Sequence, residues 1–229
     1  MAVQRIQRAS SASPWVFLLV LAALAAGFWL GSRQNASPVA LANGQSGFQV
    51  YFSPNGGATD ALVNLIDHAA KSVEVQAYSF TSRPIENALI RAHQRGVAVR
   101  IILDRSHLER RNYRTGGFTP TVSPALEAFY NAGIPTHIEY RYLIAHNKVM
   151  LIDGNTIVTG SFNFSVAAEK YNAENMLVIH NVPSLFARYD KNFAYHWQTS
   201  LPYTPGLVLP DQSRFSYHHH YHKRHEHAW

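Results

Sequence analysis

The feature that most constrains the fold is the alternation of strand-like and helix-like segments in the first half of the chain. Residues 73–80 and 97–103 have the composition of strands, and the second is nearly all apolar, as expected of a strand buried on both faces. Residues 60–70 and 84–94 place apolar side chains at helical spacing. The alternation predicts helices packed against a sheet.

The second half of the chain adds a β-hairpin to this pattern. Residues 148–152 and 156–159 are apolar strands joined by Asp153-Gly154-Asn155, a composition typical of a tight turn. The predicted fold class is therefore α/β, with a mixed β-sheet flanked by helices on both faces. The other predicted elements are strands at 48–52, 136–138 and 175–179 and helices at 124–132 and 183–198, the last with Leu185, Tyr189, Phe193 and Trp197 facing inward.

The first 31 residues predict a membrane-targeting segment. Arg5 and Arg8 precede an uncharged apolar run from Trp15 to Leu30, which is short for a membrane-spanning helix and long for the apolar part of a signal peptide. We favour an uncleaved anchor at residues 15–31 over a cleaved signal peptide. The basic residues before the run favour a cytoplasmic N-terminus, so the rest of the chain is expected to be exported to a bacterial periplasm or cell surface.

Three further regions follow this segment. Residues 32–46 are small and polar and are predicted to be a linker. Residues 47–200 contain all the predicted strands and the helices between them, and form the folded domain. Residues 201–229 are a histidine-rich tail, which we expect to be disordered, with metal binding as the alternative interpretation.

Composition excludes some classes of protein and leaves others open. The chain has no cysteine, which excludes a disulfide framework and a zinc or iron–sulfur site with cysteine ligands. Its formal net charge of +6 fits a polyanionic partner or an anionic membrane surface. The same charge fits an ordinary basic domain equally well.

The strongest chemical signal is the segment HNKVMLIDGNTIVTGSFNF, which begins at His146. His146 and Lys148 are two residues apart on a strand and therefore share a face. An imidazole beside an ammonium suits a phosphodiester, and Ser161 and Asn163 can donate hydrogen bonds to a phosphate oxygen. Asp153 lies an odd number of residues after Lys148, so its side chain does not share that face. It also lies in the turn, and we therefore assign it a structural role behind the site.

The spacing H-x-K-x-x-x-x-D with a downstream G-S-x-N resembles the phospholipase D superfamily, and the single copy resembles its bacterial Nuc-type endonuclease branch. The segments YSFTSRPI, RGV and AGIP add to the resemblance, which runs from about Phe48 to Trp197. It implies a phospholipase D-like fold and a phosphodiesterase that needs no metal and no cofactor. It also implies that Glu174, in N-x-E-N after GSFNF, pairs with His146 and orients its ring.

The resemblance further implies a displacement at phosphorus in two steps. Neutral His146 attacks to form a phosphohistidine, a second and protonated histidine gives its proton to the leaving oxygen, and water then cleaves the intermediate. Lys148 and Asn163 offset the charge that develops on the phosphate oxygens. Because the chain has only one motif, we expect a homodimer whose active site is shared across a two-fold interface.

Residues 105–120 are expected to be a polar, flexible and basic loop, because arginines here surround an aromatic residue. This combination suits single-stranded nucleic acid, and a plain solvated insertion is the alternative. The predicted function is a non-specific endonuclease acting on DNA or RNA. The alternatives are a lipid phosphodiesterase held at a membrane and a non-catalytic nucleic-acid or metal-binding protein. The candidate substrate-binding residues are Arg105, Arg110, Arg111 and Arg114.

Overall fold

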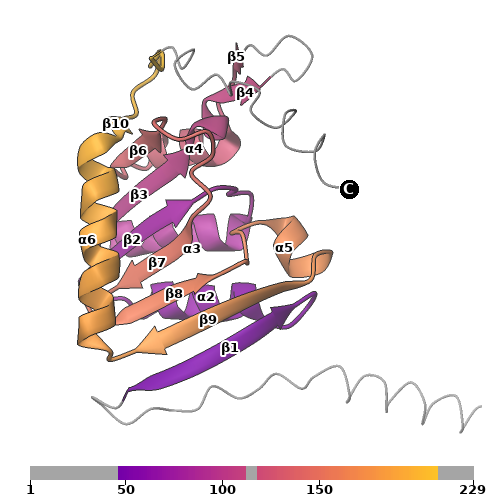
Figure 1. The fold of residues 1–229 in the computed structure, drawn as a ribbon, viewed down its shortest axis with the longest axis vertical. Coiled ribbons are helices and arrows are strands. Elements are labelled where there is room, and N and C mark those ends of the chain that lie inside the picture. Colours follow the sequence, from indigo (N-terminus) through magenta and orange to yellow (C-terminus); the bar gives the residue numbers. More distant parts are fainter. Residues whose placement is uncertain (1–45, 112–117, 211–229) are drawn as a thin grey trace, which may run out of the picture. The chain divides into compact units, whose positions relative to one another are not determined.

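The computed structural model describes residues 46–111 and 118–210 (Figure 1). The predicted anchor at 15–31, the linker and most of the tail lie outside these ranges, so the anchor and the exported location stay predictions. Among the described residues no helix is long and apolar enough to cross a membrane. The helices are α2 (Ala58–Asp67), α3 (Arg83–Gln94), α4 (Pro124–Asn131), α5 (Val166–Lys170) and α6 (Pro183–Thr199), with a 3-10 turn η1 (Arg105–His107).

Eight strands form one mixed sheet in the order β1-β9-β8-β7-β2-β3-β6-β10. Strands β2, β3 and β6 are parallel, and the other pairings in the sheet are antiparallel. The predicted mixed sheet is thus confirmed. The strands are β1 (Gly47–Ser53), β2 (Ser72–Ala77), β3 (Ala98–Asp104), β6 (Thr136–Glu139), β7 (Lys148–Ile152), β8 (Thr156–Gly160), β9 (Glu174–His180) and β10 (Leu201–Pro202).

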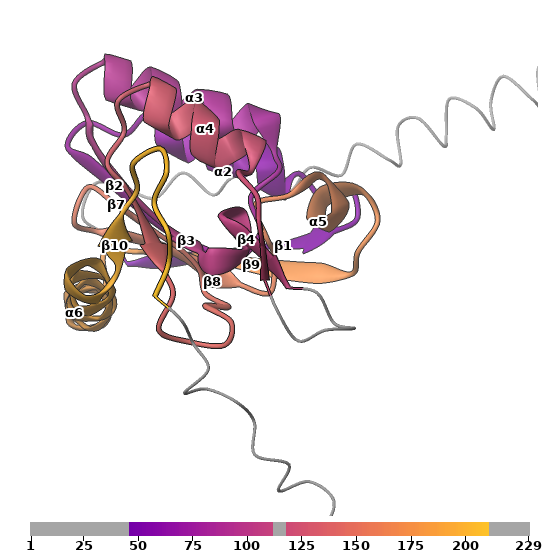
Figure 2. The same cartoon turned by 90° about the horizontal axis from the view of Figure 1, so that it is seen from above.

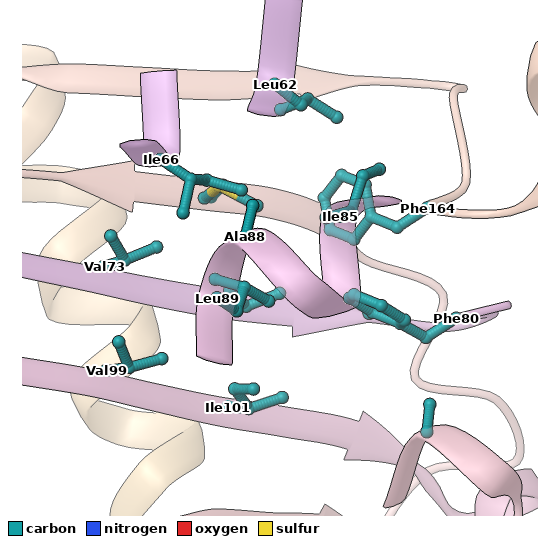
Figure 3. Packing of buried hydrophobic residues seen from close by; sticks show 14 of the residues in the cluster. Leu62, Ile66, Val73, Phe80, Ile85, Ala88, Leu89, Val99, Ile101 and Phe164 are labelled. Carbon is teal, nitrogen blue, oxygen red and sulfur yellow. The ribbon is translucent and has the colours of Figure 1, made fainter. Parts of the chain in front are cut away.

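Helices cover both faces of the sheet, as predicted. Helices α2, α3 and α4 lie on one face and α6 lies on the other (Figure 2). The first face holds the larger core, in which Leu62, Ile66 and Leu89 of the helices pack on Val73 and Ile101 of the strands (Figure 3). These side chains are fully buried, and burial of each contributes roughly 1.5–3 kcal/mol relative to exposure.

The α6 face has a smaller core. Phe193 is the one fully buried residue of the 17 in α6, and it packs on Ile102, Val149 and Leu151. The other side chains predicted to face inward, Leu185, Tyr189 and Trp197, pack against the same cluster but stay partly exposed.

The segment expected to be a flexible loop contains regular structure. The turn η1 is followed by a two-stranded hairpin of β4 (Glu109–Arg111) and β5 (Phe118–Pro120), which pair antiparallel. The arginine-rich composition gave no periodic signal for such short strands. The residues between the two strands, including Arg114, lie outside the described ranges.

Candidate functional site

The residues of the motif gather at one end of the sheet. Here β2 and β8 end and β7 and β9 begin, because β7 is antiparallel to both β2 and β8, and β9 is antiparallel to β8. We call this end the polar edge. It brings together four segments that are far apart in the sequence: Tyr78 after β2, His146 and Lys148 at the start of β7, residues 161–163 after β8, and Glu174 at the start of β9.

The side chains of His146 and Lys148 both lie close to the ring of Tyr78. The His146 ring is exposed, with its centroid 4.7 Å from that of Tyr78 at an interplanar angle of 56°. The Lys148 side chain is buried, its Nζ lies 5.2 Å from the Tyr78 centroid, and it donates a hydrogen bond of 2.8 Å to the His146 carbonyl oxygen. The structure therefore fixes the ammonium next to an imidazole that solvent can reach.

Lys148 is a buried cation with acidic neighbours. Burial lowers the pKa of its ammonium, and the charges of Glu174 and Asp104 act in the opposite direction. The carboxylates thus help to keep a positive charge at a place that would otherwise disfavour it. A phosphate bound there would add further negative charge next to the ammonium.

Ser161 and Asn163 hold different positions at this edge. Ser161 Oγ accepts hydrogen bonds from the backbone N–H of Asn175 at 3.0 Å and from its side-chain amide at 3.4 Å. Asn163 Oδ1 is buried and accepts no hydrogen bond within the described part of the chain. The described residues hold three further buried polar atoms without a partner, Gln76 Nε2 and Arg105 Nε and Nη1, so this feature alone does not mark the site.

Glu174 does not hydrogen-bond to His146 in this structure. Its Oε1 accepts a hydrogen bond of 3.0 Å from the Asn172 side-chain amide, and its backbone N–H donates to Ser53 Oγ at 3.2 Å. Its charge acts on Lys148. Glu174 thus lies at the polar edge, while its pairing with His146 stays a prediction.

Asp153 lies at the opposite end of β7, in the turn to β8. Its carboxylate accepts hydrogen bonds of 2.7–3.0 Å from the backbone N–H groups of Ala70, Lys71 and Ser72, which join α2 to β2. Burial alone raises the pKa of this carboxyl group, but the three N–H donors outweigh it, and the pKa lies below its usual value. Asp153 therefore ties the hairpin turn to the first half of the sheet and does not reach the polar edge.

The predicted substrate-binding arginines differ in their surroundings. Arg105 is buried, donates from Nη2 to Glu109 Oε2 at 2.6 Å, and packs over the Phe118 ring at 4.1 Å. This guanidinium holds the base of the β4–β5 hairpin through Nη2, while its Nε and Nη1 are buried and have no hydrogen-bond partner in the described part of the chain. Arg110 is exposed, Arg111 lies in β4, and Arg114 lies outside the described residues.

Two acidic residues support the loop that carries His146, and the sequence analysis missed both. Asp104 accepts from the backbone N–H of Ala145 at 2.7 Å, and from that of Ser106 at 2.9 Å. Glu139 accepts from the Arg141 backbone N–H at 3.0 Å and from His196 Nδ1 at 2.7 Å. The sequence signal that could have identified them is an acidic residue at the C-terminal end of each of two strands, β3 and β6.

The described residues contain no group of three or more His, Asp or Glu side chains arranged to hold a metal ion. The metal-independent mechanism therefore stays a prediction that a chelation experiment must decide.

Comparison with known proteins identifies the family. Residues 62–197 match the family profile described as "Cardiolipin synthase, PLD-like domain", which covers more than half of the chain. The chain therefore belongs to the PLD-like proteins of the phospholipase D superfamily, as the motif indicated.

Curated relatives and solved structures agree with this assignment. A protein of Rickettsia felis named "Phospholipase D" is 42% identical over 130 residues, which are 57% of this chain and 60% of that protein. The "Mitochondrial cardiolipin hydrolase" of Danio rerio is 27% identical over 150 residues, 64% of this chain and 61% of that protein. The chain thus spans about three fifths of the length of these relatives.

Among solved structures, the phospholipase D family member Nuc from Salmonella typhimurium superposes with a TM-score of 0.61 and 35% identity. The match covers 69% of this chain and 99% of Nuc. NucT from Helicobacter pylori superposes with a TM-score of 0.57 and 20% identity, over 69% of this chain and all of that one, which supports the fold alone.

Proposed function

We propose that this protein is a metal-independent phosphodiesterase that cleaves nucleic acid through a phosphohistidine. The observation that carries the proposal is the polar edge itself. An exposed imidazole and a buried ammonium at the start of β7 lie at the same end of the sheet as the Asn163 amide, which follows β8. Burying a lysine costs free energy, and an anion bound beside it would offset that cost.

In the proposed reaction the chain's own groups carry each step. His146 attacks phosphorus with a ring nitrogen while the ester P–O bond breaks, and a second histidine, in its imidazolium form, protonates the leaving oxygen. The second histidine then removes a proton from water, which attacks the phosphohistidine and frees His146. Lys148 and the Asn163 amide stabilise the negative oxygens throughout, and Glu174 turns toward the charged imidazole during the cycle.

The second histidine is the missing component. His107 is buried, and its ring nitrogens contact Ser123 Oγ at 2.7 Å and the Tyr78 carbonyl oxygen at 3.1 Å, so it supports Tyr78 from behind. His196 contacts Glu139. His68 is exposed but lies at the C-terminus of α2. The proposal therefore includes a homodimer in which His146 of a second protomer supplies the second ring at one shared site.

Nucleic acid and lipid remain the two candidate substrates. The Nuc match, which covers nearly the whole of that protein at 35% identity, and the exposed Arg110 favour nucleic acid. The relatives named "Phospholipase D" and "Mitochondrial cardiolipin hydrolase", together with the predicted anchor, favour a lipid phosphodiester. Both substrates present the same phosphodiester to the same groups.

The test uses the full chain purified in mild detergent. Plasmid DNA, single-stranded RNA and cardiolipin–phosphatidylcholine vesicles are each incubated with excess EDTA. The proposal predicts cleavage of nucleic acid that survives chelation and is lost in His146→Ala. The matched control is His68→Ala, which removes an exposed imidazole at the C-terminus of α2.

Each other outcome has a definite meaning. Release of lipid headgroups without cleavage of nucleic acid would move the assignment to the lipid phosphodiesterase. Activity that EDTA abolishes, or that His146→Ala retains, would refute the phosphohistidine mechanism. Absence of turnover on every substrate would support a non-catalytic binding protein.

A further inference from the structure

The loop of residues 140–147, which carries His146, contains no helix or strand. A segment of this kind depends on individual hydrogen bonds for its position. Side chains near the C-terminal ends of three neighbouring strands provide them. Glu139 of β6 accepts from the Arg141 backbone N–H at 3.0 Å, Asp104 of β3 accepts from that of Ala145 at 2.7 Å, and Gln76 of β2 accepts from the Asn147 side-chain amide at 3.3 Å.

These three acceptors face the same side of the sheet. In the parallel pairing of strands, Gln76 lies opposite Ile102, and Asp104 lies opposite Glu139. Ile102 belongs to the core beneath α6, and Asp104 is two residues further along β3. The three side chains therefore all point toward α6. Each of these residues is buried, so each depends on partners within the protein.

Helix α6 supplies a partner from the layer that covers this side. Its C-terminal end lies beside β6 (Figure 1), and His196 Nδ1 lies 2.7 Å from Glu139 Oε2. Since a carboxylate oxygen only accepts hydrogen bonds, the ring nitrogen is the donor. The other oxygen, Oε1, is the one that holds the Arg141 N–H. The His196 ring therefore fixes the carboxylate in the orientation that holds the start of the loop.

Glu139 has a second reason to need this partner. Asp104, the residue opposite it in the pairing, is also a buried carboxylate. Two adjacent buried carboxylates each disfavour the charge of the other, and hydrogen-bond donors offset that effect. Asp104 has two backbone donors, whereas Glu139 has one backbone donor and the His196 ring. Loss of the ring would leave Glu139 Oε2 buried without this donor.

The space among these side chains is too small for a ligand. A cavity of about 10 Å³ is lined by Gln76, Asp104, Glu139, Asn147 and His196. This is close to the smallest volume that holds one water molecule. The cluster is therefore a support for the loop and not a second binding site.

We propose that His196 is a positioning residue for His146. Its ring holds the Glu139 carboxylate, the carboxylate holds the loop at Arg141, and the loop presents the His146 imidazole beside Lys148. The inference rests on the proposed function, because it concerns the residue that attacks phosphorus. His196 acts through Glu139 and takes no part in the phosphoryl transfer itself.

The first experiment measures kcat and KM of the full chain in mild detergent, on the phosphodiester that the original chain hydrolyses. His196→Leu should lower kcat by roughly 10- to 100-fold and leave KM unchanged, because the attacking ring is misplaced while the substrate still binds. His196→Asn should recover most of that loss, since its amide nitrogen can donate from about the position of Nδ1.

The matched control is His137→Leu. His137 is also half-buried against α6, where its ring stacks on Trp197 at 3.7 Å, but its Nδ1 bonds to Ser200 Oγ and not to the loop or Glu139. The kcat of this variant, per folded molecule, should equal that of the original chain.

A second experiment needs no turnover. Hydrogen exchange, followed by mass spectrometry, reports the protection of the backbone N–H groups in the peptide over residues 140–147. In His196→Leu exchange in this peptide should become faster, while exchange in the peptide over β2 should not change. In His196→Asn the protection of the loop should return.

The outcomes separate this inference from the proposed function. Unchanged kcat and unchanged exchange in His196→Leu would overturn the inference, and so would a rise in KM alone. A loss of kcat that His196→Asn does not restore, or faster exchange throughout the domain, would also overturn it, because either would indicate a general structural role. If even the original chain hydrolyses no phosphodiester, the proposed function fails, and the exchange data still decide whether His196 holds the loop.

Discussion

The two ends of strand β7 belong to one sequence motif but differ in how their polar atoms are satisfied. At the end where β7 turns into β8, each contact of the Asp153 carboxylate is with backbone N–H groups of the same fold. At the beginning, His146 is exposed, Lys148 is buried close to acids, and the Asn163 oxygen at the same end of the sheet has no partner among residues 46–111 and 118–210. The difference teaches that satisfied groups of the motif hold the fold and unsatisfied ones are available for chemistry.

The largest expected effect is a loss of activity, without a loss of stability, at the His146 end of β7. His146→Asn should lower kcat by roughly 10⁴-fold or more, because it removes both the nucleophile and the proton carrier. The midpoint of thermal unfolding should not change, since the ring is exposed. The measurement is turnover of a fluorescent oligonucleotide together with a melting curve. A large loss of stability with retained activity would reverse the assignment of the two ends.

The next largest effect is expected at the buried ammonium. Lys148→Met keeps the stem that packs near Tyr78 but removes the charge, and should lower kcat/KM by about 10²–10³-fold. Lys71→Met, the same substitution at the residue before β2 and beside Asp153, should leave kcat/KM unchanged. Equal losses in the two variants would show that overall charge, rather than the position of Lys148, controls the reaction.

At the Asp153 end the expected loss is in stability. Asp153→Ala leaves three backbone N–H groups without their acceptor and should cost about 1–3 kcal/mol of unfolding free energy, with water replacing part of the contact. Activity per folded molecule should be unchanged. Urea unfolding measures the cost, and Asp190→Ala, in an exposed part of α6, is the control expected to be neutral.

The same substitution predicts a pH dependence with a definite sign. The pKa of Asp153 is lowered in the folded protein, so its stabilising contribution is fully present above the unfolded value of about 3.9. It is lost as the pH falls through the lower, folded value. The difference in unfolding free energy between the original chain and Asp153→Ala should therefore shrink below about pH 4. A difference that stays constant down to pH 2 would contradict a charged carboxylate in this turn.

The smallest of these effects concerns support of the His146 loop. Asp104→Asn replaces one of the two carboxylate oxygens with an amide, and one of the N–H groups at Ala145 and Ser106 then loses its acceptor. A slight shift of the loop should lower kcat by about 10-fold and leave KM unchanged, because positioning and not substrate binding is affected. A rise in KM alone would mean that Asp104 acts on substrate binding instead.

The sheet and most of its helices could be predicted from the sequence, because apolar periodicity is a local property. The hairpin at Asp153, the buried strand at 97–103 and the helix at 84–94 all lie within two residues of their predicted positions. The position of His146, Lys148 and residues 161–163 at one edge could also be predicted, because the two outer ends of a β-hairpin lie next to each other and alternate residues of a strand share a face.

Other features depend on contacts between distant segments, and the sequence could not supply them. Arg105 looked like a free basic residue, but Phe118 and Glu109 enclose it once β4 and β5 pair. The support of Ala145 by Asp104 joins residues 41 positions apart. The alternating pattern of β1 predicted a strand, yet its apolar residues face outward, because the cover of that face is not provided by the described part of the chain.

The presence of one motif histidine, His146, in each chain has a consequence for when the protein acts. If cleavage requires two chains, the number of working sites rises with the square of chain abundance while separate chains predominate. Newly made protein would be harmless to the phosphodiesters of its own cell, and hydrolysis would begin once enough copies accumulate in one compartment. The concentration of the chain would then determine whether it hydrolyses phosphodiesters.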